Sequence, residues 1–142
     1  MAIPPHEFFE AKGQFFDLEP LATDRDNWVT SIAVTVRGIL GSANLPRRHR
    51  PQDYRLLIDV TRLREELPAV WVFSPANPEI QHVNIFRPSE TCPFTRTRLP
   101  LLCWGTTGTA WQHQPQPART LSNFLEATRQ VLANANMDSR AR

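Results

Sequence analysis

Two cysteines, Cys92 and Cys103, are the residues whose type and spacing most directly suggest chemistry in this chain. They lie in the stretch from His82 to Trp111, and both follow Asn84, whose side-chain amide can donate a hydrogen bond. A thiol beside such a donor can hold an acyl group as a thioester, and the donor can stabilise the oxyanion that forms during transfer. This chemistry needs no metal and no cofactor, and we expect neither.

Two other chemistries fit the same residues less well. A zinc site would combine the two cysteines with His82 and His113, but cysteines eleven positions apart match no compact Cys-x-x-Cys pattern. A papain-like hydrolase needs a Cys, a His and an orienting group. Neither cysteine neighbourhood is typical of a nucleophile that opens a long helix, and the chain is short for that class. We therefore favour a thioester carrier.

Length and composition predict one cytoplasmic domain over residues 1–142. Hydrophobic residues make up 41% of the chain, which is enough for a core, and no apolar run approaches the roughly 18–20 residues that cross a bilayer. The N-terminus has no secretory signal pattern, so we expect reduced thiols and no membrane partner. A net charge of +2 is too small to indicate nucleic acid as a partner.

The elements that position the cysteines are predicted to be strands between two helices. Residues 5–17 predict a short helix with an aromatic cluster. Trp28–Leu40, Tyr54–Val60 and Val70–Phe73 are rich in β-branched or aromatic residues, and the first two alternate between apolar and polar positions. Because these segments follow one another through loops, they predict an antiparallel meander.

The cysteines themselves fall in a segment that we predict to be irregular. Three prolines within residues 82–105 argue against a helix or a central strand there, and the irregular path continues over residues 106–118. Apolar residues at helical spacing then predict a helix from Thr120, a good N-cap, to about Asn136. The fold class is α+β, with three or four antiparallel strands and a helix whose apolar face covers the sheet.

The order of these features resembles the ubiquitin-conjugating enzymes, and among them the small bacterial members that serve ubiquitin-like conjugation systems. Residues 82–85, His-Val-Asn-Ile, resemble the His-Pro-Asn motif of the family, with Val83 in place of the proline. Leu102-Cys103-Trp104 resembles its apolar-Cys-Leu active site, and Trp111 follows Cys103 by eight residues, as a family Trp follows the catalytic Cys. The similarity covers about residues 28–136. It implies an antiparallel meander packed on a helix, without the two C-terminal helices of the eukaryotic enzymes.

The resemblance leaves two candidates for the catalytic cysteine. The family spacing of eight residues after the motif Asn leads from Asn84 to Cys92. The apolar context before a Trp leads instead to Cys103, if the loop over residues 87–98 carries an insertion of eleven residues. We favour Cys103. The alternative interpretation of either residue is a buried packing thiol, and from the flanking Leu and Trp we expect this more of Cys103 than of Cys92.

The resemblance implies acyl transfer between proteins. A ubiquitin-like protein would pass from an activating enzyme to the cysteine as a thioester and then to an amine of a protein substrate. Asn84 would stabilise the oxyanion or support the loop, His82 and Trp111 would support the motif, and Arg87, Arg96 and Arg98 would meet an acidic partner or face solvent. The bacterial likeness suggests anti-phage defence. The alternative is a non-catalytic adaptor of the same fold that binds a ubiquitin-like protein.

Overall fold

The computed structural model describes residues 2–39, 51–75, 85, 88 and 90–133, and the backbone of residues 44–45 and 81–82. Its elements in chain order are α1 (Pro5–Lys12), β1 (Phe16–Thr23), β2 (Val29–Ile39), β3 (Asn44–Leu45), β4 (Gln52–Asp59), β5 (Val70–Ser74), β6 (Gln81–His82), β7 (Glu90–Thr91), β8 (Arg98–Leu99), α2 (Gly105–Gln112), the 3₁₀ helix η2 (Gln116–Ala118) and α3 (Leu121–Ala133). The fold class is α+β, as predicted. No helix in the described part of the chain is both long and apolar enough to cross a membrane.

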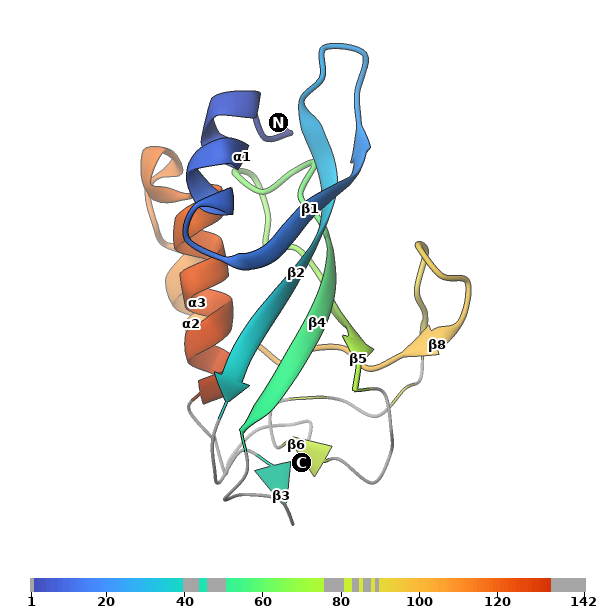
Figure 1. Ribbon diagram of the computed structural model, residues 1–142. Coiled ribbons are helices and arrows are strands. Elements are labelled where there is room, and N and C mark those ends of the chain that lie inside the picture. The colour runs from blue at the N-terminus through green and yellow to red at the C-terminus, as the bar shows by residue number, and fades with distance from the viewer. Residues whose placement is uncertain are drawn as a thin grey trace.

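The central sheet has four antiparallel strands in the order β1-β2-β4-β5 (Figure 1). The three predicted strands correspond to β2, β4 and β5, and the meander is confirmed. The register pairs Ile32 with Ile58 and Val34 with Leu56, so that the apolar residues of β2 and β4 share one face of the sheet. This alternation is why the sequence revealed these strands.

Strand β1 is the fourth strand of the sheet, and the sequence pattern does not reveal it: the predicted helix over residues 5–17 overlaps its first two residues, and residues 18–23 carry no prediction. That helix ends at Lys12, and Gly13 is its C-cap. The strand that follows buries Leu18 and leaves its other residues exposed, so it carries no alternating apolar signal. It also contains Pro20, which an edge strand tolerates because the missing N–H can face away from the ladder. The edge position of β1 therefore explains both its composition and our error.

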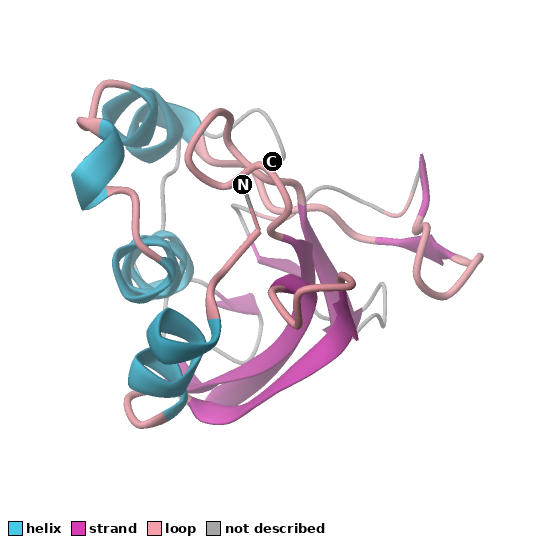
Figure 2. Cartoon of the chain, turned by 90° about the horizontal axis from the view of Figure 1, so that it is seen from above, coloured by secondary structure: helices cyan, strands magenta, loops and turns pink. Residues whose placement is uncertain are grey.

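All three α-helices lie on one side of the sheet, and the β7–β8 hairpin lies on the other side (Figure 2). The predicted C-terminal helix is confirmed as α3, and the Thr120 hydroxyl accepts a hydrogen bond from the Asn123 backbone N–H at 3.2 Å, as an N-cap residue does. Its predicted end near Asn136 lies outside the described residues. The buried face of α3, formed by Leu121, Phe124, Leu125, Val131 and Leu132, belongs to the same core as the inner face of the sheet.

Helix α2 corrects the prediction that residues 106–118 are irregular. Its sequence, Gly-Thr-Thr-Gly-Thr-Ala-Trp-Gln, has low helix propensity, because glycine and threonine both disfavour a helix interior. Packing compensates for this. The ring of Trp111 lies 5.4 Å from the ring of Phe124, and that of Trp104 lies 5.3 Å from it. Tertiary contacts with α3 therefore hold a helix that local propensity does not favour.

Candidate functional site

Cys103 stands at the end of a short segment that pairs with the edge of the sheet. The backbone N–H of Val72 donates to the Pro100 carbonyl at 2.9 Å, and the N–H of Leu102 donates to the Val70 carbonyl at 3.0 Å. Strand β5 is therefore covered on its outer edge by residues 100–102. Because Pro100 takes part through its carbonyl, its missing N–H does not interrupt this pairing. The sheet thus fixes the residue directly before Cys103.

Helix α2 begins directly after this segment. Trp104 is its N-cap residue, and Gly105 follows with φ 55°, a left-handed conformation that glycine adopts without steric cost. The Cys103 side chain is half-buried, between the edge pairing on one side and the first turn of α2 on the other. Two rigid elements therefore position a partly accessible thiol, which is what an acyl carrier requires.

The segment that resembles the His-Pro-Asn motif meets the Cys103 segment in space. Ile85 and Leu102 form an isolated antiparallel β-bridge. Ile85 follows Asn84 directly in the chain, and Leu102 precedes Cys103. The backbone of His82 pairs with Asn44 between β6 and β3. Asn84 itself and the side chain of His82 lie outside the described residues, so their roles in the motif stay predictions.

Cys92 has a different environment. It is fully buried, with 0% of its surface exposed, in a second apolar cluster. This cluster lies on the outer face of the sheet, which is the face opposite the helices. Its neighbours there are Ala33, Leu57, Trp71 and Leu99. The expectation that Cys103 is the more buried thiol is therefore wrong. Cys92 fits the description of a packing thiol, because free cysteine behaves as a small apolar residue when it is enclosed in this way.

The loop that we predicted as an irregular insertion contains a β-hairpin made by β7 and β8. Its turn is closed by two hydrogen bonds, from the Cys92 N–H to the Thr97 carbonyl and from the Arg96 N–H to the Cys92 carbonyl, both at 2.8 Å. The burial of Cys92 and Leu99 against Trp71 attaches this hairpin to the sheet. The β7–β8 hairpin thus covers an apolar part of the outer face of the sheet.

Trp111 is buried at 5% exposure and packs on Phe124 rather than facing solvent. The indole Nε1 atoms of Trp104 and Trp111 are both buried and have no hydrogen-bond partner among the described residues. Gly108, which the sequence analysis did not single out, lies between these two tryptophans in the chain. A Cβ atom at Gly108 would come within 2.6 Å of the Trp104 Cβ atom. The signal was present, because a glycine inside a helix often marks a close approach.

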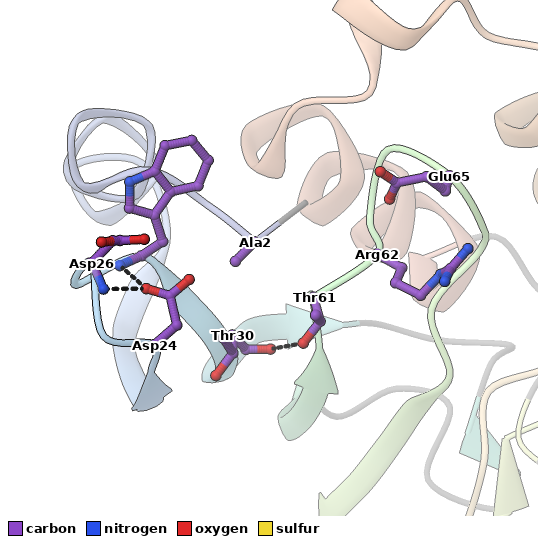
Figure 3. Close-up of a pocket in the computed structure, with 8 residues that line it drawn as sticks. Ala2, Asp24, Asp26, Thr30, Thr61, Arg62 and Glu65 are labelled. Carbon is purple, nitrogen blue, oxygen red and sulfur yellow. Dashed lines mark hydrogen bonds between the residues drawn. The ribbon is translucent and has the colours of Figure 1, made fainter.

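One hollow of the described surface lies away from both cysteines. It has a volume of about 560 Å³, and its lining includes Asp24, Trp28, Thr61 and Arg62 (Figure 3). The Asp24 carboxylate accepts hydrogen bonds from the N–H groups of Asp26 and Trp28 at 2.9 and 3.0 Å, which closes the turn between β1 and β2. In the described part of the chain, no three or more His, Cys, Asp or Glu side chains gather in a way that could hold a metal ion.

Comparison with protein-family models, with curated proteins and with solved structures found no match for this chain. Its function is therefore argued from the arrangement of the residues themselves.

Proposed function

We propose that this chain is a bacterial ubiquitin-conjugating-like enzyme that carries a ubiquitin-like protein as a thioester on Cys103. The observation that carries the proposal is the Ile85–Leu102 bridge, which brings together two segments that lie 17 residues apart and that resemble separate motifs of the family. Such a convergence is expected if the two segments belong to one site.

The order of elements supports the same proposal. A short N-terminal helix, an antiparallel meander, a segment with the thiol on the sheet edge and a helix that covers the inner face follow one another along the chain. We infer a ubiquitin-conjugating-like core. A protein tail is the acyl donor in this chemistry, so a half-buried thiol suits the reaction.

The proposed reaction has two transfers. The Cys103 thiol loses its proton to solvent, and its Sγ attacks the thioester carbonyl that joins the ubiquitin-like protein to an activating enzyme. A new C–S bond forms on Cys103, and the sulfur of the activating enzyme leaves and takes up a proton. An amine of the protein substrate then attacks the Cys103 thioester. An amide bond forms, the C–S bond breaks, and the amine proton passes to solvent.

Asn84 is the proposed donor to the oxyanion in both steps, and loss of such a donor typically lowers a rate by about 10²–10³-fold. Cys103 is preferred to Cys92 as the carrier because Cys92 is enclosed on the outer face of the sheet. Acylation of Cys92 would require the hairpin to leave that face. The bacterial resemblance extends the proposal to a cytoplasmic conjugation system in anti-phage defence.

The test is thioester formation, observed by intact-protein mass spectrometry. The chain is mixed with ATP and with the activating enzyme and the ubiquitin-like protein of a bacterial conjugation system. We expect an adduct that dithiothreitol removes, that persists in Cys92→Ala and that is absent in Cys103→Ala. An adduct that depends on Cys92 would overturn the choice of cysteine. Absence of an adduct on wild type, Cys92→Ala and Cys103→Ala, with circular dichroism showing that all three are folded, would favour the non-catalytic adaptor.

A further inference from the structure

The arginines of this chain divide into those that hold the fold together and those that do not. Arg55 pairs with Asp17 and Glu19, and Arg119 donates to three backbone carbonyls. Four further arginines, Arg37, Arg62, Arg64 and Arg129, each pair with a carboxylate or an aromatic ring. Arg25, in the β1–β2 turn, is exposed and has no such partner among the described residues. Most of the described arginines thus have a structural partner.

Arg96 and Arg98 are different. Both lie on the β7–β8 hairpin with exposed side chains, and neither makes a hydrogen bond or an ion pair through its guanidinium with any described residue. They are separated by Thr97 at the turn and the start of β8. Two free guanidinium groups, each with five donors in a planar fork, are therefore held close together on one small element.

The conformation of Arg96 adds an independent observation. Its φ is 59°, and the other described non-glycine residues with positive φ are Asp17 and Asn27. Aspartate and asparagine are enriched in this region, whereas a long side chain such as arginine is not. A turn selected for stability alone would carry glycine or asparagine at this position. The backbone conformation of the turn therefore gives no reason for an arginine at this position.

The hairpin also holds these arginines in a fixed place. Two backbone hydrogen bonds of 2.8 Å close the turn, and the Thr95 and Thr97 hydroxyls lie 2.8 Å apart within it. Cys92 and Leu99 anchor the hairpin on Trp71. Figures 1 and 2 show the hairpin projecting from the sheet on the side away from the helices. From Leu99 the chain runs directly through the edge pairing to Cys103, so the hairpin and the thiol are parts of one continuous segment.

We propose that Arg96 and Arg98 bind an acidic surface of the ubiquitin-like protein while its C-terminal tail reaches Cys103. This inference rests on the proposed function, since it names the contact that the carried protein makes. Guanidinium groups bind carboxylates through paired hydrogen bonds, and such pairs fix the orientation of a partner as well as its affinity. The hairpin acts as a positioning element and takes no part in the transfer of the acyl group.

The experiment compares charge reversal on the hairpin with charge reversal elsewhere. The fluorescein-labelled ubiquitin-like protein used in the thioester assay is titrated with wild type, with Arg96→Glu/Arg98→Glu and with Arg25→Glu. No ATP or activating enzyme is added. Arg25 is a matched control, because it is exposed in the β1–β2 turn and its side chain has no partner among the described residues. Circular dichroism and thermal unfolding establish that each variant is folded.

We expect the double variant to bind at least about tenfold more weakly and the Arg25 variant to bind like wild type, with the difference shrinking at high salt. Equal affinities for all three proteins, or no binding by wild type, would overturn the inference. A labelled DNA duplex serves as the second probe. If the double variant loses affinity for DNA and retains its affinity for the ubiquitin-like protein, the arginines serve nucleic acid and the inference fails.

Thioester formation by wild type and the two arginine variants distinguishes a failure of this inference from a failure of the proposed function. If wild type binds through the hairpin but forms no thioester, the transferase proposal fails and the contact stands. If wild type and the double variant form the thioester at equal rates when the ubiquitin-like protein is limiting, the transferase proposal stands and the contact is excluded.

Discussion

The carboxylate of Glu7 accepts a hydrogen bond from the backbone N–H of Leu121 at 3.3 Å, although 114 residues separate them in the chain. The other carboxylate oxygen of Glu7 pairs with the guanidinium of Arg64. Leu121 is the first residue of α3, so Glu7 satisfies one of the N–H groups that a helix leaves unpaired at its start. Helix α1, the β4–β5 connection and α3 thus meet at one carboxylate that is 8% exposed.

Removal of this carboxylate is expected to destabilise the whole domain. Glu7→Ala leaves Arg64 and the Leu121 N–H without their partner, and the loss of one member of a buried pair costs about 3 kcal/mol. Urea unfolding followed by fluorescence measures the change. Glu10→Ala is the control on the same helix, because Glu10 is exposed, and we expect a change within about 0.5 kcal/mol for it. Similar losses for the two variants would show that Glu7 has no special role.

Substitution of Gly108 is expected to be harmful although alanine is the better helix former. The added Cβ would lie 2.6 Å from the Trp104 Cβ atom and 3.0 Å from Leu67 Cδ2. Overpacking of this kind costs about 1–3 kcal/mol, and the gain in helix propensity of about 1 kcal/mol offsets only part of it. At Gly13 the nearest atom to an added Cβ is 3.6 Å away. We therefore expect a lower melting temperature for Gly108→Ala and an unchanged or higher one for Gly13→Ala.

The two cysteines are expected to respond differently to the same substitution. Cys92→Ser places a hydroxyl in an apolar cluster where it replaces a fully buried thiol, at a cost of about 2 kcal/mol. Cys103→Ser changes a half-buried position and should alter the free energy of unfolding by less than about 0.5 kcal/mol. Denaturant unfolding of both variants tests this. A larger loss for Cys103→Ser than for Cys92→Ser would contradict the assignment of Cys92 to packing.

The ion pair on α3 gives a prediction of pH dependence. Arg129 donates to both oxygens of Glu126, at 3.0 and 2.5 Å, and this lowers the pKa of the Glu126 carboxyl below its ordinary value of 4.5. A lowered folded-state pKa adds stability above pH 4.5 that is lost as the pH falls through the folded-state value. Because both side chains are well exposed, we expect a coupling of about 0.3–0.5 kcal/mol at neutral pH.

A double-mutant cycle with Glu126→Gln and Arg129→Gln measures this coupling. We expect it to stay constant from neutral pH to about pH 5 and to decrease over the range from about pH 5 down to about pH 3, as the carboxyl is protonated. A coupling that stays constant over this range would show that the pair contributes nothing through charge.

Periodic burial explains which parts of the fold were predictable from the sequence. The larger apolar residues of β2 and β4 alternate because every second side chain packs against the helices, although Ala33 and Leu57 are buried on the opposite face as well. Helix α3 repeats its apolar residues at helical spacing. Strand β1 and helix α2 have no such pattern. The first lies at the sheet edge with mostly exposed side chains, and the second is held by contacts of Trp104 and Trp111 with Phe124. Only the folded chain brings these contacts together.

The candidate site was predictable in its residue types but not in its burial. The flanking residues of Cys103, Leu102 and Trp104, suggested a buried thiol, but the edge pairing of Leu102 and the start of α2 leave it half-buried. Cys92 stands beside Thr91 and Pro93, both exposed, and nothing in this polar surrounding indicates that the hairpin folds its thiol onto Trp71. Neighbours in sequence were a poor guide to exposure because both segments pack through alternate residues.

Because Cys92 is buried and Cys103 is partly exposed, the reactivities of the two thiols can report local unfolding of the β7–β8 hairpin. An alkylating reagent should reach Cys103 in the native state, whereas Cys92 should react only when the hairpin detaches from the outer face of the sheet. Mass spectrometry of the two sites over the course of labelling would therefore measure, in one sample, how often the hairpin detaches and how readily Cys103 is reached while the hairpin stays in place.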